Sequence, residues 1–438
     1  MSKTLIIDNG SYEIKLDYYK PDIDSNLHIP IKLNNSIVRT NDKRLALGNS
    51  IDDIQNISNL YFKRPYEKNQ LVSWEIEKLI WDYSFNSIDL NLFVDPADCN
   101  LVLTESPLTL PKLSNNLDQI VFEEYGFKKY YRAPAASFIP FNTKKNISLL
   151  SGIDYNSTKV ELEINNGDNE TKYYSDFKLI IDSGFDSTFV IPVIYGCIYW
   201  KGVKKLDIGG RFLTGFLREV ISFRYYNVAD ETMLVNNIKE QSCFVAEDYN
   251  KSLGLLKKDR IFSIIEFVLP DFKTTTRGFV LTNSKKKELF EKGINPDEDC
   301  QILKLYDERF SVPETIFDPE ICGIRNKCGL IKTIHDCIQS VPELVRPLLV
   351  SNIVCVGGNF KLKGFKQRLI KELNQVLPID WDVKVAISED PSIYSWQSMN
   401  ELVKNHDLIN KVYISKEEYD EKGAAGIRYC QSKFGFKI

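Results

Sequence analysis

The sequence predicts an α/β protein built from two related halves. An apolar strand that ends in Asp, a polar residue and Gly occurs twice, as LIIDNGSYEIKL at residues 5–16 and as LIIDSGFDSTFV at residues 179–190. Each copy runs on into a second strand-like segment, and strand and helix patterns alternate along the rest of the chain. A single such turn would indicate only a β-hairpin. Two copies, each with an acid at the strand end, indicate two halves whose turns face each other and could hold one phosphate chain.

In the first half, residues 71–85 predict an amphipathic helix, residues 100–105 (NLVLTE) a buried strand and residues 113–127 a second helix. The expected buried faces are Ile76, Leu79, Ile80 and Tyr83 in the first helix, and Leu117, Ile120, Val121 and Tyr125 in the second.

In the second half, residues 210–223 and 361–373 predict helices, and residues 352–358 (NIVCVGG) predict a strand between them. The expected buried faces are Leu213, Phe216, Leu217, Val220 and Ile221, and then Phe365, Leu369 and Leu373.

Two polar segments, residues 142–178 and 272–300, interrupt this order and are expected to be surface insertions. The domains that follow are 1–141 with 391–438, and 179–390. The second insertion contains a cationic run beside apolar side chains, which is a candidate for partner binding, although such runs are more often solvated surface. Its residues are Lys285, Lys286, Lys287, Leu289 and Phe290.

The composition excludes several classes of protein. With 438 residues, 43% of them hydrophobic, the chain can bury a large core, and its net charge of −4 gives no overall basic field for nucleic-acid binding. Nine cysteines without a CxxC pair and only three histidines predict reduced buried thiols and no zinc site. The most apolar stretch, FVIPVIYGCIYW, is interrupted by Pro192 and Gly196, so we expect a soluble, intracellular protein.

The repeated turns carry residue types that bind phosphate and magnesium. A turn glycine lets backbone N–H groups approach a phosphate, and a strand-end aspartate can hold the water shell of a magnesium ion. Asp8 and Asp182 are these aspartates, and Lys15 could reach the phosphate charge. Gly357-Gly358 offers a third close approach, although Gly-Gly after a strand is more often an ordinary turn.

Taken together, these motifs resemble actin and the actin-related proteins from end to end. The segments are LIIDNGSYEIK, LTESPLTLPK, LIIDSG, KKLDIGGRFLTGFL, NNIKEQSCFVA, RFSVPETIFDP, NIVCVGGN and ISKEEYDEKG. Within the family, DNGSYEIK, SWEIEKLIWDY, DIGGRFLTGFLREVISFRYYN and LPDF look most like the nuclear actin-related protein 6 class. The resemblance implies the actin fold, with two ribonuclease-H-like α/β domains around an ATP cleft.

The resemblance also implies the residues of a nucleotide site. They are Asp8, Gly10, Ser11 and Lys15 in a first phosphate loop, Asp182, Ser183 and Gly184 in a second, Lys239 and Glu240 at the base and ribose, and Gly357 and Gly358 at the adenosine side. Asp8 and Asp182 would hold magnesium through water. The expected cofactor is ATP with magnesium, kept as a structural ligand and not hydrolysed, without zinc or haem.

The sequence departs from the actin pattern at the site. Phe185-Asp186 stands where actin has Asp-Gly, which is expected to weaken phosphate binding by placing a side chain and a negative charge there. Ala135 stands where actin has the water-positioning glutamine, and Phe189 replaces a histidine, so hydrolysis loses a positioning group.

Two further departures lie outside the phosphate loops. Residues 396–400 (WQSMN) replace actin's Trp-x-Gly-Gly-Ser and Ser392 replaces a lysine, which leaves the adenine end altered. Residues 39–45 (RTNDKRL) are far shorter than the actin loop that inserts into the next filament subunit. We therefore expect no self-filament.

The resemblance implies a non-polymerising, nuclear subunit of a SWR-type remodeller that exchanges histone 2A for its Z variant, with a further pool in the cytoplasm. Its expected partners are the remodeller motor subunit and a zinc-finger HIT protein, with nucleosome or histone contact indirect and no membrane contact. The alternative is an autonomous actin-like ATPase or a sugar-kinase relative, because fold alone does not separate these functions. Ala135 and Phe185-Asp186 argue against turnover.

Overall fold

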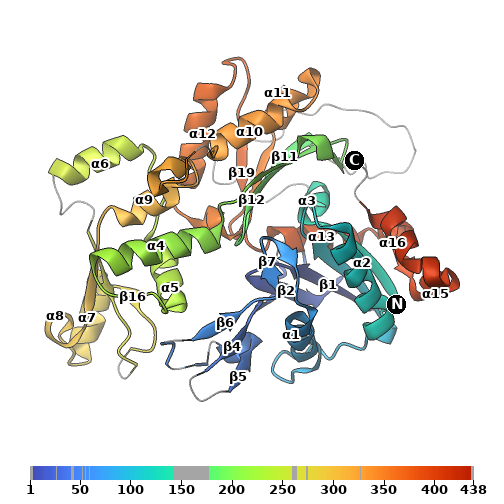
Figure 1. The fold of residues 1–438 in the computed structure, drawn as a ribbon, viewed down its shortest axis with the longest axis horizontal. Coiled ribbons are helices and arrows are strands. Elements are labelled where there is room, and N and C mark those ends of the chain that lie inside the picture. Colours follow the sequence, from blue (N-terminus) through green and yellow to red (C-terminus); the bar gives the residue numbers. More distant parts are fainter. Residues whose placement is uncertain are drawn as a thin grey trace.

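The computed structural model describes residues 3–435 apart from 26, 41–43, 52, 55, 59, 143–176, 259–263, 273–274 and 326. Two large sheets form the centres of two halves. In Figure 1 the long strands of one are blue to teal, and those of the other are green to orange. We call the two sheets the first and the second sheet.

The first sheet has the strand order β20-β10-β9-β1-β2-β3. β1 and β2 form an antiparallel hairpin, whereas β9 and β10 extend the sheet parallel to β1. The strands are β1 (Lys3–Asn9), β2 (Glu13–Tyr18), β3 (Ile31–Asn34), β9 (Cys99–Glu105), β10 (Lys129–Pro134) and β20 (Ile414–Ser415).

The second sheet has the order β13-β12-β11-β18-β19, with β14 also paired to β12. β11 and β12 form an antiparallel hairpin, and β18 and β19 run parallel to β11. The strands are β11 (Phe177–Ser183), β12 (Thr188–Ile194), β13 (Cys197–Ile198), β14 (Lys204–Leu206), β18 (Ile353–Val356) and β19 (Val385–Ile387). A hairpin followed by parallel strands thus occurs in both halves, which confirms the predicted α/β fold with two related domains.

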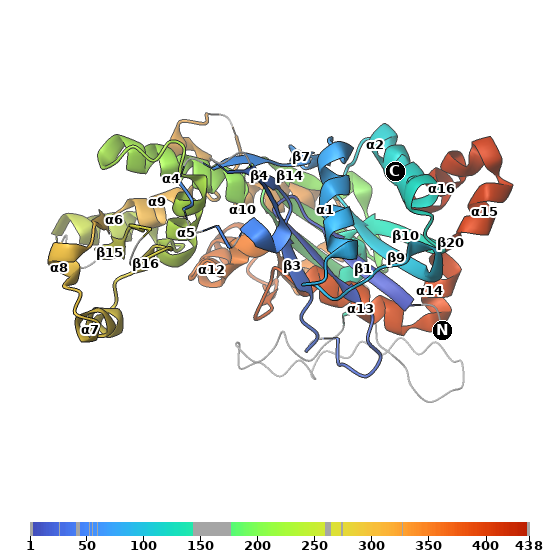
Figure 2. The same ribbon diagram turned by 90° about the horizontal axis from the view of Figure 1, so that it is seen from below.

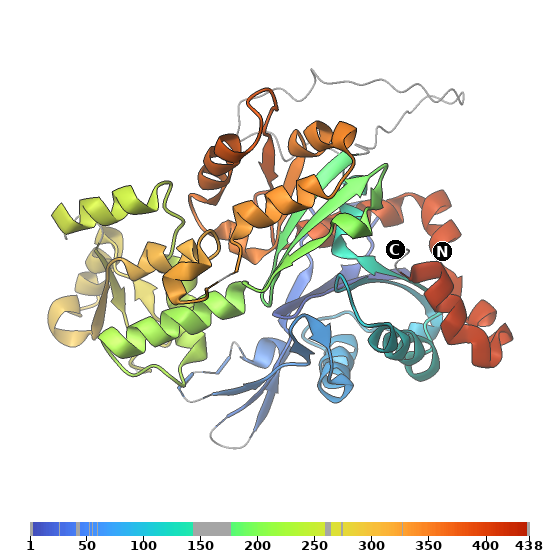
Figure 3. The same cartoon turned by 45° about the horizontal axis from the view of Figure 1, so that its top comes forward.

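Successive residues of the central strands face opposite helix layers, as the period of two along a strand requires. Leu5 and Ile7 pack under α1, α2 and α16, whereas Ile6 packs against α13. Ile181 packs against α10 and α12, whereas Ile180 contacts the core that includes Tyr394 of α13. Helix α13 therefore contributes to a core of each sheet, and α10, in orange, lies along the green strands of the second sheet in Figure 3.

The helices of the first half are α1 (Trp74–Asn86), α2 (Pro111–Gln119), α3 (Ala135–Phe138), α13 (Tyr394–Lys404), α14 (His406–Val412), α15 (Lys416–Glu421) and α16 (Gly426–Phe434). Those of the second half are α4 (Gly210–Arg224), α5 (Thr232–Ser242), α6 (Tyr249–Lys258), α7 (Asn283–Glu291), α8 (Pro296–Asp299), α9 (Glu308–Glu314), α10 (Leu330–Gln339), α11 (Arg346–Val350) and α12 (Phe365–Val376). Among the described residues, no helix combines the length and apolarity needed to cross a membrane.

Small sheets extend both halves. The first half carries β4 (Ile37–Arg39), β5 (Leu45–Leu47) and β6 (Tyr61–Lys63), and the hairpin of β7 (Tyr66–Glu67) with β8 (Gln70–Leu71). The second half carries β15 (Ile265–Val268), β16 (Phe279–Val280) and β17 (Ile302–Leu305). Figure 2 shows the resulting flat, elongated outline, with α7 and α8 at one end and α15 and α16 at the other.

The helix predictions hold for α2, α4 and α12 and only in part for α1. Leu117, Ile120 and Val121 of the second predicted helix are buried. Leu213, Leu217 and Ile221 of α4 are buried, as are Phe365, Leu369 and Leu373 of α12. In α1 the buried set is Glu77, Ile80, Trp81, Ser84 and Phe85, and Leu79 is exposed. The predicted face of α1 is therefore confirmed at Ile80, and Ile76 and Tyr83 pack partly buried against the same core. The prediction is wrong at Leu79 and missed Trp81 and Phe85, which fill this core and contact each other.

The two segments expected to be insertions differ from that expectation where they are described. Phe177 and Lys178 belong to β11, and residues 143–176 lie outside the described residues. Within 272–300, β16 pairs with β15, and Leu281 and Leu289 are buried against Val268. This segment is part of a small folded region rather than a separate surface excursion.

Candidate functional site

A cavity of about 350 Å³ lies between the β1–β2 and β11–β12 turns. Ten of the eleven residues predicted for the nucleotide site line it, and only Ser183 does not. The Ser183 hydroxyl is buried, where it shares a hydrogen bond with the Thr188 hydroxyl and accepts one from Asn359 Nδ2. The structure therefore brings the predicted residues together, and their binding of a ligand stays a prediction. The lining residues among them are Asp8, Gly10, Ser11, Lys15, Asp182, Gly184, Lys239, Glu240, Gly357 and Gly358.

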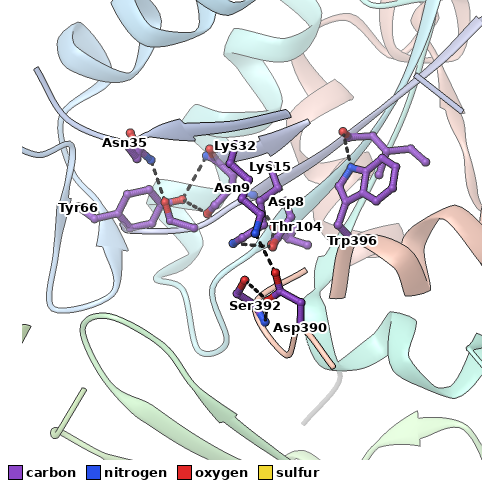
Figure 4. A network of polar contacts seen from close by, with 12 residues as sticks. Asp8, Asn9, Lys15, Lys32, Asn35, Tyr66, Thr104, Asp390, Ser392 and Trp396 are labelled. Carbon is purple, nitrogen blue, oxygen red and sulfur yellow. Dashed lines mark hydrogen bonds and ion pairs between the residues drawn. The ribbon is translucent and has the colours of Figure 1, made fainter. Parts of the chain in front are cut away.

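Asp8 is fixed by neighbours on two adjacent strands (Figure 4). Lys15 lies opposite Asp8 in the β1–β2 register, and its Nζ is 3.2 Å from Asp8 Oδ2. Thr104 Oγ1, from β9, donates to Asp8 Oδ1 at 2.9 Å and accepts from the Asn9 backbone N–H at 2.8 Å. Burial alone would lower the pKa of Lys15, but Asp8 and Glu13 outweigh burial and raise that pKa, so Lys15 keeps its charge.

Asp182 is the matching carboxylate of the second hairpin. Burial, reinforced by the negative charge of Asp8 and opposed by Lys15, raises the pKa of Asp182 to about 7. Carboxylate oxygens suit a hydrated divalent cation, and a bound cation would favour the ionised form of Asp182. The donor chemistry thus fits water-mediated magnesium at Asp8 and Asp182. Among the described residues, no group of three or more His, Cys, Asp and Glu side chains is arranged to hold a metal ion.

Gly357 allows the turn after β18 to approach the end of β11 at the cavity wall. Gly357 has φ of 103°, and a Cβ there would lie 2.2 Å from the Ser183 carbonyl oxygen, so only glycine fits. A Cβ at Gly358 would meet open space. Asn359 follows directly and donates to the Gly184 carbonyl at 2.8 Å, which ties this turn to the second hairpin.

Lys239 and Glu240 are held at another wall by polar groups of α4 and α5. Lys239 Nζ lies 2.9 Å from Thr214 Oγ1 and 2.8 Å from Asn236 Oδ1. Burial lowers the pKa of Lys239. Asn236 Nδ2 also donates to Glu240 at 2.8 Å, so one asparagine positions both candidate ligand-contacting residues.

Asp390 connects the two halves beside the cavity (Figure 4). Its carboxylate lies 2.9 Å from Lys32 Nζ of the first half and 2.9 Å from Lys361 Nζ of the second. Burial opposes ionisation of Asp390, but Ser392, Lys32 and Lys361 outweigh it and lower its pKa. Ser392, expected as a lysine from the family pattern, therefore has a local role: its hydroxyl donates to Asp390 at 2.5 Å.

The departures from the actin pattern have different consequences in space. Ala135, Phe185 and Phe189 line the cavity, so a methyl group occupies the wall where a water-orienting amide was expected. Asp186 does not line it. Its Oδ2 accepts the Asn69 backbone N–H at 3.0 Å, and its Oδ1 lies 3.5 Å from Arg211 Nη1. The expectation that Asp186 places a negative charge toward the phosphate site is therefore wrong.

Trp396 has a structural role in α13. Its side chain is fully buried, and its Nε1 donates to the Ile6 carbonyl oxygen at 3.1 Å (Figure 4).

Several lining residues were missed by the sequence reasoning, and a simple signal would have found some of them. Thr104 and Glu105 end a strand parallel to β1, and the carboxyl ends of parallel strands meet at one sheet edge. Asn359 directly follows the Gly-Gly pair. Tyr12 and Asn236 gave no comparable signal, because their contact joins different halves.

The proposed partner-binding residues divide into exposed and buried ones. Lys285 pairs with Glu288, and Lys286 pairs with Glu266. Phe290 is exposed, but Leu289 is buried in the small core of this region. Leu289 is thus a folding residue and cannot serve as an apolar anchor without local unfolding.

The chain resembles known proteins over almost its whole length. A family model described as Actin matches residues 1–434. A protein of Debaryomyces hansenii named Actin-like protein ARP6 is 44% identical over 445 residues, which cover 99% of this chain and 98% of that protein. Proteins of the same name are 42% identical over 442 residues in Kluyveromyces lactis and 41% over 454 residues in Saccharomyces cerevisiae, each covering 99% of this chain and 98% of the relative. The chain therefore belongs to the actin family.

Proposed function

We propose that this actin-related protein is a non-polymerising subunit of a nuclear, SWR-type ATP-dependent chromatin remodelling complex that exchanges histone 2A for its Z variant. It acts there as a structural and nucleosome-coupling module, and the motor ATPase resides in another subunit. A zinc-finger HIT protein and the motor subunit are its proposed partners. Contact with histones or the nucleosome is indirect, and a second pool of the protein resides in the cytoplasm.

The observation that carries this proposal is the similarity to proteins named ARP6 at 41–44% identity across 98% of their length. The remodelling role itself is what the resemblance to the actin-related protein 6 class implies. The short connection between β4 and β5 supports the non-polymerising part. Arg39 pairs directly with Leu45, and the Thr40 N–H donates to the Arg44 carbonyl at 3.0 Å, so the hairpin closes at once.

We further propose that the cavity holds ATP with magnesium as a structural ligand. Magnesium would neutralise phosphate charge when bound, with its waters held by Asp8 and Asp182. Lys15, whose Nζ lies 3.2 Å from Asp8, would meet the phosphate charge. Lys239 and Glu240 line the cavity and are the proposed contacts of the base and ribose. Ala135 offers no polar group to orient an attacking water, which supports binding without turnover.

Affinity purification of the tagged chain from its native nuclei tests the proposal. We expect the remodeller motor ATPase and a zinc-finger HIT protein to co-purify in amounts comparable to the bait, together with histone-exchange activity. All three should be absent from an untagged control. Imaging of the same tagged chain should show a mainly nuclear signal.

Recovery of the chain alone, or in sedimenting filaments, would contradict the subunit role. Recovery as a monomer that also releases phosphate from ATP would favour the alternative, an autonomous actin-like ATPase or sugar-kinase-like enzyme.

A further inference from the structure

Two aromatic residues, one shortly after each turn glycine, touch each other across the cavity. Tyr12 follows the first turn and Phe185 the second, and their ring centroids are 5.0 Å apart with the planes tilted by 41°. Both residues line the cavity. The Tyr12 hydroxyl also accepts a hydrogen bond from Asn236 Nδ2 of α5 at 3.1 Å. The two halves are thus joined twice through one tyrosine.

Arg64 covers both rings from the side of the first half. Its Cζ lies 4.8 Å from the Tyr12 ring centroid and 4.7 Å from the Phe185 ring centroid, within the range of cation–π attraction. Its Nη1 also lies within hydrogen-bond distance of the carbonyl oxygens of Tyr12 and Asn35, each at 3.2 Å. Burial lowers the pKa of Arg64 to about 10, so the guanidinium remains charged near neutral pH.

A polar contact lies beside this aromatic group. The Asn69 N–H at the tip of the β7–β8 hairpin donates to Asp186 of the second turn at 3.0 Å. Lys68 and Asn69 have φ of 48° and 68°, the left-handed pair typical of a tight type I′ hairpin turn. The Asp186 side chain is only 3% exposed, so its contact with Asn69 is shielded from water.

We propose that five residues form a clasp that holds the two halves together: Tyr12, Arg64, Asn69, Phe185 and Asp186. With the clasp closed, a nucleoside diphosphate and a nucleoside triphosphate bound in the cavity are both released slowly, and their release rates are similar. The nucleotide part rests on the proposed ligand of the cavity. The clasp contacts need no ligand atom, because ring stacking, cation–π attraction and the Asn69–Asp186 hydrogen bond are all between protein groups. A third phosphate is then not required to bridge the turns.

Release of a fluorescent N-methylanthraniloyl nucleotide from the full-length chain tests this directly. The protein is loaded with labelled ADP or ATP and magnesium, and excess unlabelled nucleotide is added. We expect Arg64→Gln and Phe185→Ala to release both nucleotides about tenfold faster than the wild type, since tenfold corresponds to about 1.4 kcal/mol. Arg309→Gln is the matched control, because the Arg309 guanidinium lies 5.0 Å from the Phe244 ring within the second half. Its release rate should stay at the wild-type value.

Hydrogen–deuterium exchange of the nucleotide-free protein tests the clasp independently of any ligand. The Asn69 amide should be protected in the wild type and should exchange faster in Asp186→Ala and in Phe185→Ala, with Arg309→Gln unchanged. Unprotected Asn69 in the wild type, or release rates unaffected by Arg64→Gln, would overturn the clasp. Failure of the wild type to bind either nucleotide would instead refute the proposed ligand and the exchange part of the inference, and exchange at Asn69 would still decide whether the clasp exists.

Discussion

Glu77 provides the sharpest test of the structure around the first turn. This glutamate of α1 is fully buried, and among the described residues neither of its carboxylate oxygens has a hydrogen-bond partner of good geometry. Burial raises the pKa of Glu77 to about 7 from its ordinary 4.5, although Asn9, Asn35 and Trp81 lie close enough to oppose part of the shift. Asn35 also donates to the Gly10 carbonyl at 2.9 Å, so the carboxyl group lies behind the candidate phosphate turn.

The effect on stability follows from the difference between the folded and unfolded pKa. A pKa raised in the folded state means that the folded protein binds the proton more tightly, so the contribution of Glu77 is fully present below pH 4.5. It is lost as the pH rises toward 7, and the loss levels off above that pH. The contribution of Glu77 to the free energy of unfolding therefore falls by about 3 kcal/mol over this pH range, since each pKa unit corresponds to about 1.4 kcal/mol.

Replacing Glu77 by Gln removes this dependence while keeping the shape of the side chain. We expect the free energy of unfolding of Glu77→Gln, relative to wild type, to rise by about 3 kcal/mol between pH 4.5 and pH 8. Urea denaturation followed by tryptophan fluorescence measures it, because Trp81 lies near this site. Glu75→Gln, an exposed position of the same helix, is the control and should show no such trend. If Glu77→Gln and the wild type differ in free energy of unfolding by the same amount at both pH values, the pKa of Glu77 is not raised in the folded protein.

Three further predictions concern assembly, turnover and the region around α7. After sedimentation in the salt and magnesium that polymerise actin, the chain at micromolar concentration should stay in the supernatant, because the β4–β5 connection is short. Pelleted filaments would show that this connection does not limit polymerisation. Phosphate release from ATP should not exceed that of a Lys15→Ala control, since loss of a positioning group commonly costs orders of magnitude in rate; clear turnover would show that Ala135 does not abolish it. Leu289→Ala should destabilise the β15–β17 region by about 2–5 kcal/mol, whereas Phe290→Ala should stay within about 0.5 kcal/mol and lower only the yield of the assembled complex. Thermal denaturation and a pull-down separate these effects, and equal stability of both variants would contradict the burial of Leu289.

The sequence was most informative where a local pattern determines a local structure. The two hairpins, each with an aspartate as the last residue but one of its first strand, followed from turn chemistry and the strand period. Both turns line one cavity, and Gly357-Gly358, directly after β18, line it too because β18 runs parallel to β11.

The features that the sequence did not predict depend on packing between segments that are distant in the chain. The periodic pattern of α1 could not place Glu77 on the buried side, because a polar residue is normally assigned to solvent. The burial of Trp81 likewise depends on a ring contact with Tyr125, which is distant in the sequence. The polar composition of 272–300 likewise concealed two buried leucines, since a small core needs only a few apolar side chains.

The two residues after the second turn glycine show why a family pattern can misjudge a site. Compared position by position with actin, Phe185 and Asp186 indicate a weaker phosphate site, because a ring and a carboxylate stand where actin has an acid and a glycine. The direction of a side chain at a turn depends on what lies beyond the turn, and here that is the tip of the β7–β8 hairpin, 117 positions earlier in the chain. Asp186 therefore turns toward Asn69 and Arg211, and Phe185 meets Tyr12 and Arg64. Comparing sequences shows only which contacts a substitution removes. Whether the substitution weakens or strengthens the site follows only from the contacts that the new side chain makes in the structure.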